Sequence, residues 1–429
     1  MSNYQIKEIK SDRIGDKYFE IQHESGLKIF LYPKENNNST YAVFGTKYGS
    51  IDMCFQSSED SEVQKVPAGI AHYLEHKLFE SEDGDAFTRY AKTGVSANAY
   101  TSFDATCYLF SGSDNIYEAL EILLDFVQSP YFTEQTVQKE QGIIGQEIRM
   151  YDDDPQWRVL FNLLGALYQK HPVKTDIAGT VESIAKITPE LLYKCYHTFY
   201  NLNNMALAVA GNIDVDRVLQ LCDKMLKPSK PIQVDRIFEE EPQAIVQDRV
   251  EQKLSVAVPL FELGFKEKAG KTRLSSKEVA ETEILLNAIA SDASPLFRRL
   301  LDAGLVNETS FSYEYFEGPG YASVIFSGES KDPDKVADEI KKELAAVRQN
   351  GLNRDAFERS RKAVYGRIVS SFNSVDYLAN ALVADAFAER SLFDYLNAVA
   401  SADLESVQNR LKTQLLPEYS ALSIIKPAE

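Results

Sequence analysis

The pattern of hydrophobic positions along the chain changes repeatedly between one typical of β-strands and one typical of amphipathic α-helices. Short apolar runs at 27–32, 41–45 and 205–211 predict buried strands, and the alternation across 95–110 predicts a strand pair. Apolar residues recur with a helical period at 67–79, 116–127, 134–151, 157–168, 189–200 and 215–226. The first half of the chain therefore mixes strands and helices, as an α+β domain does.

A similar order of elements returns after a break. Residues 227–243 hold three prolines and three consecutive glutamates, which predicts a linker. Strands are then expected near 254–265, 309–316, 321–327 and 419–425, and helices from a capping box at Ser275–Glu278 and at 333–349, 355–372 and 376–389. Because 429 residues exceed one ordinary core, we predict two domains, 1–228 and 243–429, joined by 229–242.

The predicted helix at 67–79 carries paired histidines. His72 and His76 lie four residues apart and share one helix face, and Glu75 lies on the same side. Two imidazoles and a carboxylate supply nitrogen ligands and a base for a zinc-bound water, and H-x-x-E-H occurs in zinc proteases. A surface helix with solvated histidines is the alternative, but the apolar stripe beside them indicates a buried border.

A catalytic zinc needs a third protein ligand. Glu140 and Glu147 are seven residues apart in the predicted helix at 134–151, so they share one face. Isoleucines accompany them there, and carboxylates on a partly apolar face need a cation or a hydrogen-bond partner. An ordinary exposed helix in an acidic protein remains the alternative, above all for Glu140.

These motifs resemble the pitrilysin–insulinase–mitochondrial processing peptidase superfamily, in which H-x-x-E-H precedes a glutamate ligand by seventy-odd residues. Here Glu147 follows His76 by 71 residues, and Glu140 precedes Glu147 by seven. The resemblance implies one zinc ion per chain on His72, His76 and Glu147, with Glu75 as general base and Glu140 as its catalytic helper. It implies two similar α+β domains, each a mostly antiparallel β-sheet packed against helices, which together form half of a clamshell.

The resemblance extends to the peptide substrate. The segment Ser96–Thr101 resembles the edge strand to which the family adds a short or unfolded peptide as an extra strand. Asn98 and Ala99 are the substrate-binding positions that follow from it, with Asn98 in contact with the peptide backbone. The short polar side chain of Asn98 is equally typical of a turn or bulge.

One part of the family pattern is missing. Active relatives clamp the peptide with an arginine and a tyrosine seven residues later, in a segment resembling S-x-L-F-x-x-x-R-E-x-x-x-L-x-Y. In the matching stretch 294–309, Leu301 occupies the arginine position, and Asn307 or Glu308 occupies the tyrosine position. We therefore expect a heterodimer, rather than a homodimer, with a related subunit that brings the Arg/Tyr pair.

The sequence does not show another arginine or tyrosine nearby that would take the place of the missing clamp pair. Arg298 and Arg299 lie one turn early and are expected at the surface or in helix packing. Tyr313 and Tyr315 fall in the following strand, where they could belong to the core or to a cleft.

Composition excludes several functions. The net charge of −18 and the absence of a basic patch argue against nucleic-acid binding, and no apolar stretch is long enough to span a membrane. The first ten residues lack the apolar core of a signal peptide, and four scattered cysteines read as reduced thiols, so we expect a cytoplasmic protein. A structural or assembly subunit and a zinc-dependent peptide-binding module remain alternatives to the peptidase, although a scaffold has no need of Glu75.

Overall fold

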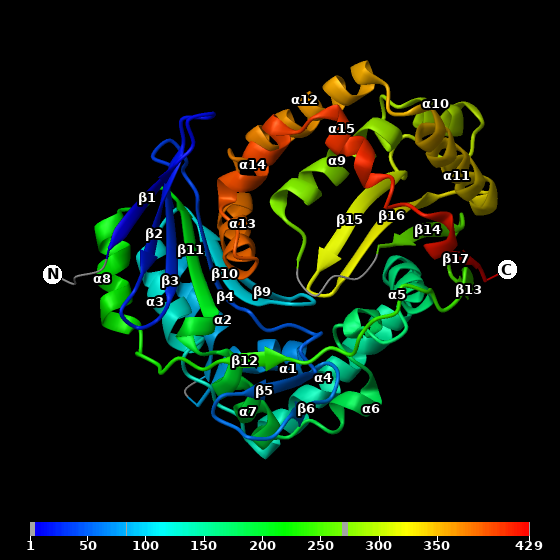
Figure 1. The fold of residues 1–429 in the computed structure, drawn as a ribbon. Helices are drawn as coiled ribbons and strands as arrows, with labels where there is room; N and C mark the ends of the chain where they lie inside the picture. Colours follow the sequence, from blue (N-terminus) through cyan, green and yellow to red (C-terminus); the bar gives the residue numbers. More distant parts are fainter. Residues whose placement is uncertain (1–4, 83, 268–272, 429) are drawn as a thin grey trace. The chain divides into compact units, whose positions relative to one another are not determined.

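The computed structural model describes residues 5–82, 84–267 and 273–428 (Figure 1). They form two compact units, and each unit combines several segments of the chain. Unit 1 comprises 1–148, 176–237 and 369–392, and unit 2 comprises 149–175, 238–368 and 393–429. The change of unit at 237/238 lies within the predicted linker, while the division into 1–228 and 243–429 stays a prediction. Residues 1–4, where the segment inspected for a signal peptide begins, lie outside the described residues.

Unit 1 is built on a seven-stranded sheet in the order β1-β2-β3-β11-β4-β10-β9. The strands are β1 (Ile6–Lys10), β2 (Lys17–Gln22), β3 (Lys28–Pro33), β4 (Thr40–Thr46), β9 (Ser96–Thr101), β10 (Thr106–Gly112) and β11 (Met205–Gly211). All neighbours are antiparallel except β3 and β11, which are parallel. Every residue of β11 is buried, which explains its continuous run of apolar residues.

Helices cover both faces of this sheet. On one face, α3 (Ile116–Phe126) places the Phe126 ring 5.6 Å from the Tyr108 ring of β10. On the other face, α13 (Val375–Phe387) approaches so closely that a Cβ atom at Gly45 would lie 2.8 Å from the Val383 side chain. A helix from the second half of the sequence thus completes the core of unit 1, because β4 and β11 are apolar on both faces.

The remaining elements of unit 1 frame the candidate site. They are β5 (Cys54–Ser57), β6 (Gln64–Lys65), α1 (Ile70–Leu78), β7 (Glu80–Ser81), β8 (Gly84–Asp85), α2 (Ala86–Thr93), α4 (Glu134–Asp152), α6 (Val181–Ile184), α7 (Pro189–Phe199), α8 (Val215–Met225) and β12 (Val234–Arg236). The predicted start of the first helix at Pro67 is wrong, since α1 begins after Gly69. Gly69 has φ +88°, and a Cβ there would lie 2.4 Å from the Ala178 carbonyl oxygen, so the chain turns before the helix can start.

Unit 2 contains a five-stranded sheet in the order β13-β17-β14-β16-β15, with only β13 and β17 parallel. The strands are β13 (Arg249–Leu254), β14 (Leu260–Lys266), β15 (Ser312–Gly318), β16 (Tyr321–Glu329) and β17 (Ser420–Pro427). One face is covered by α5 (Pro155–Leu167), whose Leu163 and Leu167 lie against Gly264. Unit 2 therefore takes α5 from the first half of the sequence, as unit 1 takes α13 from the second.

The other helices of unit 2 are α9 (Ser276–Ala290), α10 (Pro295–Asp302), α11 (Pro333–Asn350), α12 (Arg354–Ser371), α14 (Leu392–Ser401) and α15 (Leu404–Arg410). The predicted capping box is confirmed, since the Ser275 side chain accepts from the Glu278 backbone and the Glu278 side chain accepts from the Ser275 backbone. The hydrophobic pattern did not predict the short helices α14 and α15.

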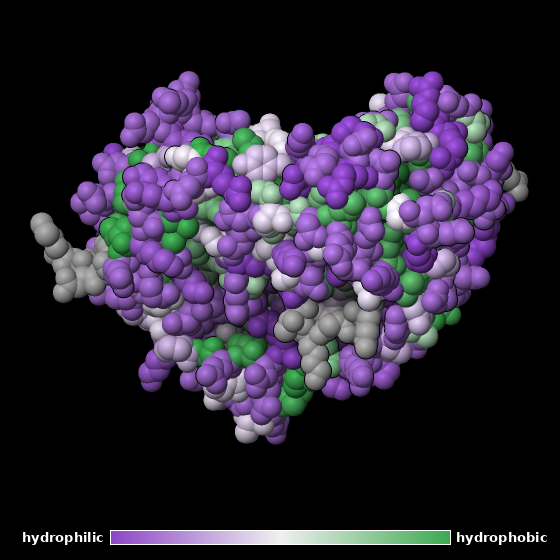
Figure 2. All heavy atoms as spheres, turned by 45° about the horizontal axis from the view of Figure 1, so that its top comes forward, coloured by the Kyte–Doolittle hydropathy of each residue, from purple (hydrophilic) through white to green (hydrophobic). Residues whose placement is uncertain are grey.

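The predicted α+β class, with mostly antiparallel sheets packed against helices, is confirmed. Hydrophilic residues dominate the face seen in Figure 2, in keeping with the acidic composition. Within the described part of the chain, every helix is too short or too polar to cross a membrane.

Candidate metal centre and catalytic site

Two helices of unit 1 bring the three predicted metal ligands together. Glu147 on α4 places Oε2 3.4 Å from His76 Nε2 and 3.7 Å from His72 Nε2, both on α1. One ligand atom from each of these residues lies within 4.8 Å of the other two. Among the described residues, this is the only group of three or more His, Cys, Asp or Glu side chains with such an arrangement.

Glu140 fixes the orientation of His76. The distance from His76 Nδ1 to Glu140 Oε1 is 3.0 Å, and because an ionised carboxylate only accepts, Nδ1–H must donate. Burial opposes a charged imidazole, but the hydrogen bonds to Glu140 and Glu147 outweigh it and raise the pKa of His76 to about 10. Burial likewise opposes ionisation of Glu140, and the His76 hydrogen bond nevertheless lowers the pKa of that carboxyl.

His72 lies in a different environment. It is 8% exposed, and burial lowers its pKa to about 4, so this imidazole is neutral at pH 7 and offers a nitrogen lone pair. Its Nδ1 atom is buried and has no hydrogen-bond partner among the described residues, in contrast to the Nδ1 atom of His76.

The donor set fits a zinc ion. Two imidazole nitrogens and one carboxylate oxygen are a recurrent set of three protein ligands for catalytic zinc, which keeps a fourth position open. Glu75, Glu140 and Glu147 gather near the two histidines, and the charged form of His76 compensates three partly buried carboxyl groups only in part, which is costly. A divalent cation would relieve this cost.

Glu75 is held from the edge of the sheet. Thr101 Oγ1 donates to Glu75 Oε2 at 2.7 Å, and Thr101 is the last residue of β9. Burial raises the pKa of the half-buried Glu75 carboxyl, and the hydrogen bond from Thr101 opposes that rise. Sequence reasoning missed Thr101, because only the tertiary contact between β9 and α1 gives it a role.

Asn98 and Ala99 lie in the regular ladder between β9 and β10, opposite Leu109 and Tyr108. The turn or bulge considered for Asn98 is therefore not formed. Asn98 is exposed on the edge strand of the sheet, and its Oδ1 accepts from the Ala99 N–H at 2.9 Å. Their contact with a peptide stays a prediction.

A pocket of about 560 Å³ adjoins the site. Its lining includes Glu75, His76, Asn98, Ala99 and Glu140, so the catalytic groups and the edge strand face one space. An apolar wall of Phe79, Phe87 and Ile143 faces the same space, with the two phenylalanine rings stacked at 4.3 Å. Phe87 is 45% exposed, and no motif in the sequence pointed to it.

The expected surface role of Arg298 and Arg299 is confirmed. Both lie on α10, where Arg298 Nε is 3.0 Å from Asp302 and Arg299 pairs with Glu343. Leu301, at the position of the clamp arginine, lies on the same helix and is half-buried.

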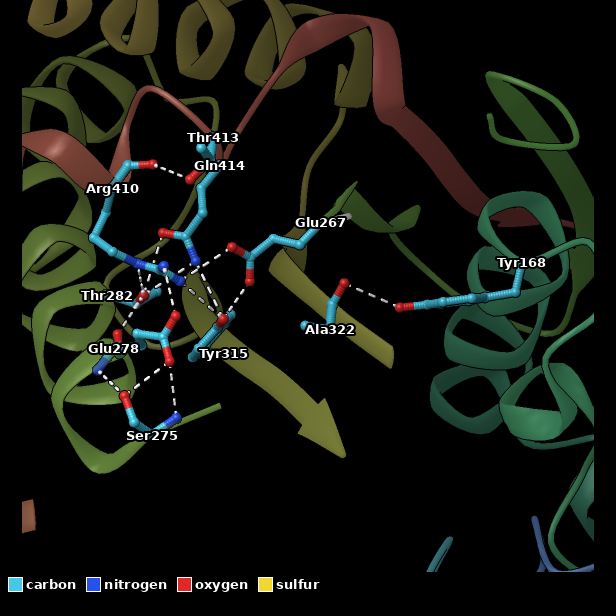
Figure 3. A network of polar contacts seen from close by, with 10 residues as sticks. All are labelled: Tyr168, Glu267, Ser275, Glu278, Thr282, Tyr315, Ala322, Arg410, Thr413 and Gln414. Carbon is cyan, nitrogen blue, oxygen red and sulfur yellow. Dashed lines mark hydrogen bonds and ion pairs between the residues drawn. The ribbon is translucent and has the colours of Figure 1, made fainter. Parts of the chain in front are cut away.

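An arginine and a tyrosine do meet elsewhere in unit 2 (Figure 3). Arg410 Nη2 lies 3.1 Å from Glu267 Oε1 and 3.3 Å from the Tyr315 hydroxyl, which itself donates to Glu267. Gln414 Nε2 donates to the same hydroxyl at 3.2 Å. Tyr315 is thus a core residue engaged by its neighbours, and the Tyr313 hydroxyl accepts from Asn287 Nδ2 at 2.9 Å.

Two family models match most of the chain. The family model described as Insulinase (Peptidase family M16) matches residues 58–181, and the model described as Peptidase M16 inactive domain matches 186–364. The chain belongs to peptidase family M16, the insulinase family, as the sequence resemblance implied.

Individual proteins similar to this chain support the same family. An uncharacterized zinc protease, YmfH of Bacillus subtilis, is 39% identical over 98% of this chain and 99% of its own length. The crystal structure of a putative M16-like peptidase from Alicyclobacillus acidocaldarius is 35% identical with a TM-score of 0.91, covering 100% of this chain and 99% of that one. Pitrilysin shares the fold, with a TM-score of 0.76 at 18% identity over 100% of this chain and 47% of its own.

Proposed function

We propose that this chain is a zinc metalloendopeptidase that hydrolyses short or unfolded peptides. The observation that carries the proposal is the convergence of His72, His76 and Glu147 beside Glu75, with Glu140 bonded to His76. The family membership and the zinc-protease names of relatives support it.

When bound, zinc would lower the pKa of a bound water and polarise the scissile carbonyl. His72, His76 and Glu147 would hold the ion, and Glu140 would keep the His76 ring oriented by its bond to Nδ1. Glu75 would take the water proton and later deliver it to the leaving amine. Oε2 of Glu75 accepts from Thr101, so Oε1 is the atom we assign to proton transfer.

The substrate would bind as an added strand. β9 is the edge strand of its sheet and joins the catalytic base through Thr101, so a peptide paired to β9 would lie beside Glu75. Main-chain pairing requires an extended peptide, which favours short or unfolded substrates over folded proteins. We assign the apolar wall of Phe79, Phe87 and Ile143 to one substrate side chain.

The direct test replaces Glu75 and measures metal and turnover separately. Glu75→Gln should retain zinc and lose hydrolysis of a fluorogenic peptide, whereas His76→Ala should lose both. Wild-type turnover in Glu75→Gln would contradict the base assignment. Metal retention with turnover absent in the wild type, even with the related subunit added, would favour a zinc-dependent peptide-binding module, and absence of metal would favour a structural subunit.

We further propose that a related subunit supplies the missing Arg/Tyr clamp, which makes the active form a heterodimer. Leu301 at the arginine position and the engagement of Arg298, Arg299 and Tyr315 within unit 2 support this. Adding a related subunit that carries R-E-x-x-x-L-x-Y should raise peptidase activity, and full activity from the purified chain alone would contradict it. A cytoplasmic location stays a prediction.

A further inference from the structure

A row of polar residues crosses one face of the unit 2 sheet. Glu262 on β14 pairs with Ser327 on β16 and with Ser423 on β17, and Ser327 pairs with Ser312 on β15. Directly paired residues point to the same face, so these four side chains form one line. Gly264, two residues after Glu262, contacts α5, which shows that the line faces α5.

A pocket opens where this row reaches the start of α5. It measures about 340 Å³, within the range of roughly 300–1,000 Å³ typical of small-ligand sites. Its polar lining residues are two carboxylates, three serines, a threonine and a glutamine: Glu262, Glu329, Ser310, Ser312, Ser327, Thr309 and Gln156. Val159 and Leu260 supply an apolar wall.

Two of these oxygen-bearing side chains lack partners. Glu262 Oε2 and Ser310 Oγ are shielded from solvent and have no hydrogen bond among the described residues. Burial, with a smaller contribution from the Glu314 carboxylate, raises the pKa of Glu262 to about 8. The structure therefore buries a carboxyl group without compensating it, which normally costs stability.

Another buried charge on the same strand is treated differently. The Lys266 ammonium, fully buried, meets the Glu241 carboxylate and accepting carbonyls of Leu167 at 3.0 Å and Pro242 at 2.7 Å. Unit 2 thus gives the buried Lys266 ammonium a full set of hydrogen-bond partners, but it leaves one carboxyl oxygen of Glu262, four residues earlier, without any. A buried polar group left without a partner and without a gain in stability is most often found at a functional site.

We propose that this pocket binds an organic cation, an ammonium or guanidinium group, with Glu262 as its counter-charge. Serine hydroxyls accept from the remaining N–H groups, and the apolar wall contacts the methylene stem that such cations carry. A metal ion is disfavoured, since within the described ranges only His72, His76 and Glu147 cluster as metal ligands. The cation could be a basic side chain of a peptide or a free amine.

Calorimetric titration of the full chain tests the site without any peptidase readout, so failure of the proposed hydrolysis leaves it intact. N-acetyl-arginine amide should bind at least tenfold more tightly than N-acetyl-citrulline amide, its neutral isostere. Putrescine is the free-amine probe: tighter binding of the arginine derivative assigns the site to peptide side chains, and the reverse assigns it to free amines. Binding of neither cation overturns the proposal, as does binding of Mg²⁺ alone.

Substitutions distinguish binding in this pocket from nonspecific attraction of cations to an acidic protein. Glu262→Gln should abolish the preference for arginine over citrulline without lowering the midpoint of thermal unfolding, because it removes an unpaired carboxyl. Ser310→Ala should weaken arginine binding severalfold and serves if Glu262→Gln does not fold. Glu314→Gln removes an equal charge outside the pocket lining and should retain the preference. Equal losses in Glu262→Gln and Glu314→Gln would overturn the proposal.

Discussion

Units 1 and 2 follow the same order of elements and differ in how they treat their polar groups. In unit 1, β4 leads to α1, the pair β9–β10, α3 and α4; in unit 2, β14 leads to α9, the pair β15–β16, α11 and α12. Both sheets contain one parallel pair, and β9 and β15 are both edge strands. The helix that follows α4, α5, belongs to unit 2, and the helix that follows α12, α13, belongs to unit 1.

The difference lies at the first helix of each unit. On α1, His72 and His76 face the carboxylates of Glu140 and Glu147, and the charged form of His76 pairs with both. On α9, the Thr282 hydroxyl accepts from Arg410 Nε at 3.1 Å, and the same guanidinium meets Glu267 and Tyr315. The same order of elements thus carries a histidine–carboxylate cluster with the donor set of a metal site in unit 1, and a network centred on an arginine in unit 2.

The largest expected effect is on catalysis in unit 1. Glu75→Gln should lower kcat by roughly 10²–10⁴-fold, the usual contribution of a general acid–base group, while zinc content stays unchanged. Glu278→Gln on α9 is the matched control and should leave kcat at the wild-type level. Equal losses in the two variants would contradict the assignment of chemistry to unit 1.

The next effect is on the stability of unit 2. Arg410→Met should lower the free energy of unfolding by about 3–5 kcal/mol, because Glu267 would remain buried without its cationic partner. The exposed pair Arg298–Asp302 gives the control, for which Arg298→Met should cost at most about 1 kcal/mol. Urea unfolding of both variants measures the difference, and similar small losses would mean that the network does not stabilise unit 2.

A smaller effect is expected on metal affinity. Glu140→Gln should weaken zinc binding by roughly 10–100-fold, because His76 loses the carboxylate that orients its ring. Competition with a chelator measures the affinity, and Glu134→Gln on the exposed first turn of α4 is the control. Unchanged affinity in Glu140→Gln would show that the bond does not support the metal.

The last expected effect depends on pH and concerns Glu262. Its pKa is about 8 in the folded protein and near 4.5 in an unfolded chain, so the unfolded state releases the proton first as pH rises. Ionisation of Glu262 therefore removes stability between about pH 4.5 and 8. Glu314 and Glu329 are the other carboxyl groups close to it. Urea midpoints should show Glu262→Gln gaining on the wild type from pH 5 to pH 8; a constant difference would contradict the shift.

The sequence predicted most elements where the hydrophobic period is strong. The strands β3, β4 and β11 and the helices α3, α4 and α11 lie within a residue or two of their predicted limits. The start of α1 was misplaced because the left-handed turn at Gly69 depends on the approach of Ala178, more than a hundred residues away. The short helices α14 and α15 offer too few turns for a clear period.

Local spacing alone determined which groups share a face: four residues join His72 to His76, and seven join Glu140 to Glu147. Tertiary structure decided which faces meet, because packing of α4 against α1 sets the distances among the ligands, and the end of β9 brings Thr101 to Glu75. It also decided that the Tyr315 hydroxyl is hydrogen-bonded within unit 2, whereas Oε2 of Glu262 has no hydrogen-bond partner among the described residues. Such long-range contacts arise from burying apolar surface of the whole chain, which local periodicity does not encode.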